Sequence, residues 1–228
     1  MRTILFLLLL VIAGPAAAQQ MACAGTVAPG LAYPDINGKW AGLEIKLCHD
    51  IAQKIGETSV FTPVLQDTDM LPATSMRRVL FLPARNIPAG YVAGPEIYND
   101  YQAIMVPAGS KARNAADLAG AEICVVPGSP EDFNLTRYFA RHKIMLREFV
   151  FQETGEMHDA YVAGRCDAIT ARRSLLIGLR ANEDGARRDD VILPDDLGDN
   201  PIRVATQAGQ PVWAALVAKI VQENTHGF

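Results

Sequence analysis

The alternation of apolar and polar residues divides the chain into short helices and strands. In the stretch GLEIKLCHDIAQKIGE, Leu47, Ile51 and Ile55 recur at helical spacing, which predicts a helix that ends at Gly56. The stretches SVFTPV and YQAIMVP predict strands, and Pro107 bounds the second of them. The first half of the chain is therefore predicted to contain both helices and strands.

From about residue 111 the two kinds of element alternate regularly. Helices are predicted in NAADLAG, PEDFNLTRYFARH, MHDAYVAG and SLLIGLRAN, and strands in AEICVV, MLREFVFQ and CDAIT. A strand in IRVAT and an amphipathic helix in PVWAALVAKIVQEN follow near the end of the chain. Because alternating strands and helices build a sheet covered by helices, the pattern predicts an α/β fold with mainly parallel sheets.

The N-terminal residues have the pattern of an export signal. Arg2 precedes an apolar run over residues 4–13, and small residues follow as far as a cleavage site after residue 18. The run is about half as long as the roughly 20 residues that a membrane-spanning helix requires. An uncleaved anchor and lipidation at Cys23 are the alternatives, but residues 20–22 make a poor lipobox. We therefore expect a signal peptide over residues 1–18 and a soluble periplasmic protein, without membrane insertion once the signal is removed.

Composition excludes several classes of function. The chain has 21 Lys and Arg against 25 Asp and Glu, a formal net charge of −4, and no basic run. Nucleic acid is therefore not an expected partner. The four histidines are scattered and no C-x-x-C pair occurs, so neither a metal site nor a cofactor is expected.

Four cysteines, Cys23, Cys48, Cys124 and Cys166, lie in a chain that we expect to be exported. An even number of cysteines in an oxidising compartment argues for two disulfides. Four cysteines allow three pairings, and the positions along the chain do not choose among them. If the chain folds into two lobes and each lobe contains one pair, sequential pairing of Cys23 with Cys48 and of Cys124 with Cys166 is preferred.

The sequence Ser129-Pro130-Glu131-Asp132 marks the start of a helix. Ser129 can cap the helix, Pro130 suits its first position, and Asp132 stands where a capping box has its acidic partner. The alternative is that free backbone N–H groups at this turn receive an anionic group of a ligand. The acidic neighbours weaken that alternative.

An ordered series of segments resembles the extracellular solute-binding proteins for polar amino acids, especially the general L-amino-acid type. The segments are APGLAYPDINGKWAGLEIKLCHDIA, YQAIMV, AADLAGAEICVVPGS, NLTRYF, YVAGRCDAIT, VILP and the final P-x-R-V-A with its following glycine and tryptophan. Each segment is a weak signal by itself. Taken in order, and together with all four cysteines, the segments cover nearly the whole mature chain.

The resemblance implies a two-lobed fold of the periplasmic-binding-protein type, class II, in which each lobe is a mainly parallel sheet flanked by helices. Residues 19–103 and 200–228 would form lobe 1, and residues 104–199 would form lobe 2. It also implies one disulfide in each lobe, Cys23–Cys48 and Cys124–Cys166. A small-molecule ligand would bind between the lobes of a monomer, and an ABC permease or another periplasmic protein would be the partner.

The positions that would hold an amino acid depart from the family pattern. The family's carboxylate-binding arginine of lobe 1 is not evident in the shortened stretch after residue 83, where Arg85 and Asn86 are the nearest candidates. In lobe 2, Arg172 stands where the family has the aspartate that binds the α-ammonium group. A permanent cation there would repel an ammonium group and favour an anion.

Two further candidates follow from the resemblance. Ser129 lies at the family's carboxylate-binding turn of lobe 2, and Tyr33 lies in its aromatic region of lobe 1. The hypothesis is therefore a solute-binding protein of amino-acid type with altered preference for an organic acid or another anion. The alternative is a degenerate binding-protein fold that serves as a periplasmic accessory or sensor partner, for example of a dehydrogenase system. We do not expect an enzyme, because no catalytic set can be assembled from the sequence.

Overall fold

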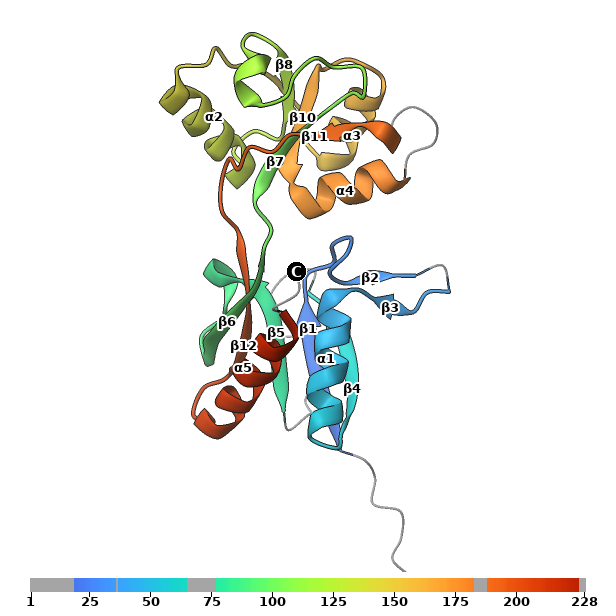
Figure 1. Cartoon of the computed structure of the whole chain (residues 1–228), viewed down its shortest axis with the longest axis vertical. Coiled ribbons are helices and arrows are strands. Elements are labelled where there is room, and N and C mark those ends of the chain that lie inside the picture. The colour runs from blue at the N-terminus through green and yellow to red at the C-terminus, as the bar shows by residue number, and fades with distance from the viewer. Residues whose placement is uncertain (1–18, 36, 65–76, 183–187, 226–228) are drawn as a thin grey trace, which may run out of the picture.

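A computed structural model describes residues 19–35, 37–64, 77–182 and 188–225, and Figure 1 shows two lobes joined by two chain crossings. The predicted signal peptide lies outside the described residues. Among those residues, no helix is long and apolar enough to cross a membrane.

Lobe 1 is a five-stranded sheet with two helices packed on one face (Figure 1). Its strands, in the order β4-β1-β5-β12-β6, are β4 (Thr58–Pro63), β1 (Gln20–Gly25), β5 (Arg78–Pro83), β12 (Pro201–Gln207) and β6 (Tyr91–Asn99). The helices are α1 (Leu43–Lys54) and α5 (Pro211–Thr225). A short ladder of β2 (Tyr33–Pro34) and β3 (Trp40–Ala41), and the 3-10 turn η2 (Ala84–Asn86), complete the lobe.

Burial follows the predicted pattern in lobe 1. The α1 residues Leu47 and Ile51 are fully buried and share one core with Val217 of α5 and Phe81 of β5. Their helical spacing places them on one face of α1, as the sequence predicted. The buried stripe of α1 therefore fixes this helix against the sheet of lobe 1.

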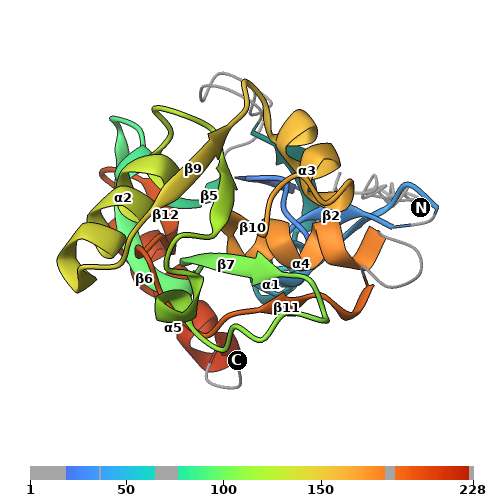
Figure 2. The same cartoon turned by 90° about the horizontal axis from the view of Figure 1, so that it is seen from above.

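Lobe 2 is a second five-stranded sheet with helices on both faces. Its strands, in the order β11-β7-β10-β8-β9, are β11 (Val191–Ile192), β7 (Gln102–Val106), β10 (Ala168–Arg172), β8 (Glu122–Val125) and β9 (Arg147–Val150). Figure 2 shows α2 (Pro130–His142) on one side of this sheet, and α3 (Thr154–Val162) and α4 (Arg173–Asn182) on the other. The NAADLAG segment forms only the 3-10 turn η3 (Ala115–Leu118). All five residues of β7 are buried, because both faces of the sheet are covered.

The two-lobed α/β fold is confirmed, but both sheets are mixed and not mainly parallel. In each sheet two strand pairings are parallel and two are antiparallel. The antiparallel pairings all involve β7 or β12, the strands that follow the two crossings. β7 and β12 enter their lobes from the neighbouring lobe and run opposite to the strands that strand–helix–strand connections join. The sequence pattern could not show this difference in direction.

The crossings run side by side between the sheets. The Asp100 N–H group donates to the carbonyl of Asn200 at 3.0 Å, and the Gln102 N–H group donates to that of Gly198 at 3.0 Å. β7 begins at Gln102, two residues ahead of the predicted start of lobe 2 at 104. Backbone bonding of this kind makes the connection a short two-stranded hinge.

Each lobe contains one disulfide. Cys23 of β1 is bonded to Cys48 of α1, with 6.1 Å between Cα atoms, and Cys124 of β8 to Cys166, with 5.8 Å. Both distances are usual for disulfides. Of the three possible pairings, the structure has the one that the family resemblance implied.

Candidate ligand-binding cleft

Two adjoining cavities lie at the ends of the lobe 2 strands that face lobe 1. The first, of about 240 Å³, lies between the lobes. The second, of about 280 Å³, lies within lobe 2. Arg172 and Leu175 line both cavities. Since loops at the carboxyl ends of parallel strands are the usual ligand sites of α/β sheets, we take these cavities as the candidate site.

The two lobes contribute different chemistry to the interlobe cavity. Lobe 1 supplies the loop 26–29 and the side chains of Leu31, Pro83, Asn86 and Ile202, which are mostly apolar. Lobe 2 and the first crossing supply Arg172, Ser174, Leu175 and Asp100. The charged groups of this cavity are therefore on the lobe 2 side.

Arg172 is the last residue of β10, and an ion pair holds its side chain. Its Nε–H group donates to Oε1 of Glu131, in the first turn of α2, at 3.1 Å. The two side chains keep 29% and 22% of their exposure, so both remain partly accessible. A guanidinium has five N–H donors, and this bond engages one of them. Glu131 thus holds Arg172 through one donor and leaves the other four N–H donors without a bond to Glu131, in a side chain that lines both cavities.

The turn before α2 is satisfied by its own side chains. Ser129 Oγ accepts the Asp132 N–H group at 3.1 Å, and the Asp132 carboxylate accepts the Gly128 N–H group at 2.7 Å. This is the capped helix start that the sequence predicted. Because these two N–H groups are engaged, anion binding at this turn would have to displace the internal bonds.

Asp100 connects the hinge to lobe 2. Its side chain is 3% exposed, and its two carboxylate oxygens accept the N–H group and the hydroxyl of Ser174 at 2.9 and 2.7 Å. Ser174 lies in the first turn of α4, where a carboxylate is favoured by the free N–H groups and the helix dipole. Asp100 therefore fixes the position of α4 over the cleft.

The five predicted ligand residues are not all brought together. Asn86, Ser129 and Arg172 line the two cavities. Tyr33 is exposed in β2 and Arg85 is exposed in η2, and neither lines these cavities among the described residues. Whether any of the five binds a ligand stays a prediction.

Asp100, Glu131 and Ser174, whose side chains make the polar contacts described above, were not predicted as residues of the cleft. Glu131 appeared in the sequence only as part of a helix start, and the other two lie far apart in the chain. Contacts over such separations leave no local signal. Among the described residues, no group of three His, Cys, Asp or Glu side chains could hold a metal ion.

A buried carboxyl group lies beside the loop that lines the cleft. Glu44, in the first turn of α1, is 1% exposed, and its Oε2 atom has no hydrogen-bond partner. A side chain at Gly25 would meet this oxygen, because an ideal Cβ atom there would lie 2.0 Å from it. Burial, and then the charge of Asp100, raise the pKa of Glu44 well above its usual value.

We expect this carboxyl group to make the protein less stable as the pH rises. Because the pKa of Glu44 is higher in the folded than in the unfolded state, the protonated carboxyl group contributes its full stability below the unfolded pKa of about 4.3. That stability is lost as the pH rises from the unfolded to the folded pKa, and the loss is about 1.4 kcal/mol for each unit between the two pKa values. Glu44→Gln should remove this loss and unfold at higher denaturant concentration than the parent at pH 8. The matched control is Glu122→Gln, whose side chain is 40% exposed. Equal pH dependence in the parent and Glu44→Gln would refute the expectation.

Helix α4 touches lobe 1 at a glycine. A Cβ atom built on Gly178 would lie 2.0 Å from Cγ of Pro29, a residue of the cleft loop. Figure 1 shows α4 on the side of lobe 2 that faces lobe 1. The rigid ring of Pro29 cannot easily move aside, so the lobes approach this closely because residue 178 has no side chain.

Gly178→Ala should therefore oppose this arrangement of the lobes without unfolding α4. Alanine is favoured over glycine in a helix by up to about 1 kcal/mol, whereas overpacking costs about 1–3 kcal/mol. We expect ligand affinity to fall about tenfold and small-angle scattering to show a larger radius of gyration, with the melting temperature unchanged or higher. An unchanged affinity and radius would show that the Pro29 contact does not control the approach of the lobes.

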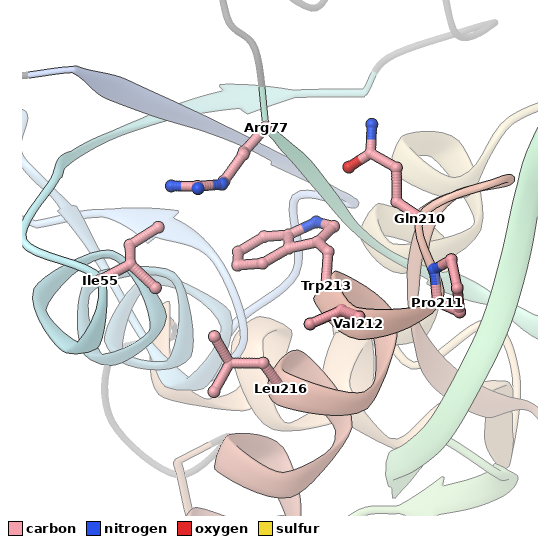
Figure 3. A pocket seen from close by; sticks show the side chains of 7 residues that line it. All are labelled: Ile55, Arg77, Gln210, Pro211, Val212, Trp213 and Leu216. Carbon is pink, nitrogen blue, oxygen red and sulfur yellow. The ribbon is translucent and has the colours of Figure 1, made fainter.

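A larger cavity, of about 410 Å³, lies elsewhere in lobe 1 (Figure 3). It is lined by Ile55, Arg77, Gln210, Pro211, Val212, Trp213 and Leu216. The guanidinium of Arg77 lies over the Trp213 ring, 5.5 Å from its centroid, and is paired with Glu57. The cavity lies where α1 ends and α5 begins, at the end of lobe 1 remote from lobe 2 (Figure 1). It is therefore separate from the candidate site.

The two-lobed fold with a cavity between its lobes is the architecture of periplasmic binding proteins, and comparison with solved structures agrees. A periplasmic binding protein from Brucella ovis with glutathione bound is 26% identical, with a TM-score of 0.67, over 89% of this chain and 66% of that one. A substrate-binding domain of a putative amino acid ABC transporter from Streptococcus pneumoniae has a TM-score of 0.72 at 14% identity, which shows the fold alone, over 90% of this chain and 93% of that one.

Sequence comparison identifies the relatives. The general L-amino acid-binding periplasmic protein AapJ of Rhizobium johnstonii is 31% identical over 83% of this chain. The glutamate/glutamine/aspartate/asparagine-binding protein BztA of Rhodobacter capsulatus is 27% identical over 82%. The chain spans 58% of the length of each, and no family model matches it. The chain is a divergent relative of the periplasmic amino-acid-binding proteins of ABC transporters, which are binding proteins and not enzymes.

Proposed function

We propose that this protein captures a small solute bearing a carboxylate, an organic acid or another organic anion, in the periplasm and delivers it to an ABC permease. The observation that supports the proposal is the place of Arg172 at the junction of the two cavities, with its guanidinium held by Glu131. A planar guanidinium binds a carboxylate through two parallel hydrogen bonds.

The other charged groups support an anionic ligand over a free ammonium group. Asp100 is the second carboxylate of the cleft, and both of its oxygens are engaged by Ser174. Glu131 gives one oxygen to Arg172. An amino acid bound as in the relatives would therefore place its ammonium group beside a permanent cation, with one partly engaged carboxylate to offset it.

A thermal-shift screen of the oxidised mature protein tests the proposal. The panel consists of amino acids, keto acids, dicarboxylates and small inorganic anions. A ligand at 100 times its dissociation constant should add about 2.7 kcal/mol to the free energy of unfolding. We expect the organic carboxylates to raise the melting temperature.

Two results would contradict the proposal. Stabilisation by many free L-amino acids, with no response to other carboxylates, would show that Arg172 does not exclude the ammonium group. Unchanged melting curves across the panel would favour the accessory role, in which the cleft is not closed by a small molecule.

A further inference from the structure

The candidate cleft has two compartments that meet at one guanidinium. The interlobe compartment measures about 240 Å³ and the lobe 2 compartment about 280 Å³. Pockets for small-molecule ligands usually measure about 300–1,000 Å³, so each compartment alone falls short of that range and the joined space lies within it. The space therefore suits a ligand with two arms that diverge at Arg172.

The compartments differ in lining. The lobe 2 compartment has both polar residues, such as Ser129 and Thr154, and the apolar side chains of Val126, Met157 and Leu175, and these apolar side chains can pack against an aliphatic side chain. The interlobe compartment has the apolar residues Val27 and Ile202 and, beside them, the side-chain amide of Asn86. A primary amide both donates and accepts hydrogen bonds, as a ligand amide does. The interlobe compartment thus suits an arm attached through an amide.

The position of Arg172 specifies what lies between the two arms. It lines both compartments, and Glu131 engages its Nε–H group, so a carboxylate bound to its outer edge would lie at the junction. In an amino acid the carbon that carries the carboxylate also carries the side chain and the nitrogen. Those two substituents would then enter the two compartments.

A free ammonium group fits this arrangement poorly. It would lie one carbon from the carboxylate, close to the guanidinium, and would leave one compartment without an occupant. Acylation of the nitrogen removes the charge and supplies the second arm. Asp100 already accepts two hydrogen bonds from Ser174, and Glu131 accepts one from Arg172, so both carboxylates of the cleft have fewer lone pairs left for an ammonium group.

We infer that the cleft takes an amino acid whose nitrogen is acylated, either an N-acyl amino acid or the C-terminal residue of a short peptide, with its free carboxylate on Arg172. The inference rests on the proposed function, in which Arg172 binds a carboxylate, and adds the class of ligand. The acyl arm lies against Asn86 between the lobes, and the side chain enters lobe 2.

Isothermal titration calorimetry with four related ligands separates the inference from the proposed function. The ligands are leucine, N-acetyl-leucine, alanyl-leucine and N-acetyl-leucinamide, applied to the oxidised mature protein. We expect N-acetyl-leucine and alanyl-leucine to bind at least tenfold more tightly than leucine, and N-acetyl-leucinamide not to bind. Asn86→Ala should reduce the preference for N-acetyl-leucine over leucine, whereas the exposed lobe 2 variant Arg147→Gln should keep it.

Each contrary result has its own meaning. Leucine binding as tightly as N-acetyl-leucine would overturn the inference and leave the carboxylate site in place. N-acetyl-leucinamide binding as tightly as N-acetyl-leucine would overturn the proposed function, because Arg172 would then not recognise a carboxylate. Absence of binding by all four ligands would count against both.

Discussion

Arg172→Gln should weaken the binding of a carboxylate ligand by about 10- to 150-fold. A hydrogen bond to a charged group contributes about 1.5–3 kcal/mol, and each 1.4 kcal/mol corresponds to a tenfold change in affinity. The variant also leaves the carboxylate of Glu131, which is 22% exposed, without its cationic partner. Calorimetry with the best ligand of the screen measures the effect.

The control for this variant is Arg147→Gln. Arg147 also belongs to lobe 2 and is also paired with a glutamate, Glu122, but its side chain is 57% exposed and lines neither cleft cavity. Both variants remove one positive charge, so the loss of affinity should occur only at position 172. The double variant Glu131→Gln/Arg172→Gln removes the unpaired carboxylate and should not restore binding. Equal affinity in Arg172→Gln and the parent protein would exclude Arg172 from the binding site.

Replacing Cys124 and Cys166 together with alanine should lower the free energy of unfolding by about 4 kcal/mol. The disulfide joins residues separated by 42 positions, and the loss of chain entropy in the unfolded state grows with the length of the closed loop. The pair Cys23 and Cys48, separated by 25 positions, should contribute about 3.5 kcal/mol by the same reasoning. These values are a large part of the roughly 5–15 kcal/mol that stabilises a typical domain.

Urea unfolding of the parent and both double variants, with and without a reducing agent, measures these contributions. The reducing agent should lower the midpoint of the parent and of each double variant, because each double variant keeps one disulfide. The variant that lacks all four cysteines provides the control and should not respond. A parent midpoint that is the same under oxidising and reducing conditions would contradict the stabilising role.

Local sequence signals predicted the elements that are stabilised by their own residues. The start of α2 at Ser129 and Pro130 is a pattern of adjacent residues, and the apolar stripe of α1 repeats at helical spacing. The strands β1, β5 and β6 were not predicted. β6 is only partly buried along its length and contains Pro95, so its apolar and polar residues do not alternate regularly.

The candidate site was predicted less completely than the fold. Arg172 and Ser129 came from the family resemblance and lie in the cleft, and Asn86 lines its lobe 1 side. The partner of Arg172 could not be inferred, because Glu131 is 41 residues away along the chain. The approach of Gly178 to Pro29 depends on how two separate lobes meet.

By itself, the sequence determined the alternation of helices and strands, the capped start of α2 and the expectation of export with two disulfides. These properties depend on residues close together in the chain or on composition. Only the tertiary structure decided which strands pair antiparallel, how Glu131 holds Arg172, and how two cavities meet at that guanidinium. These properties depend on distances between residues far apart in the chain, which packing of the two sheets and the hinge between them determines.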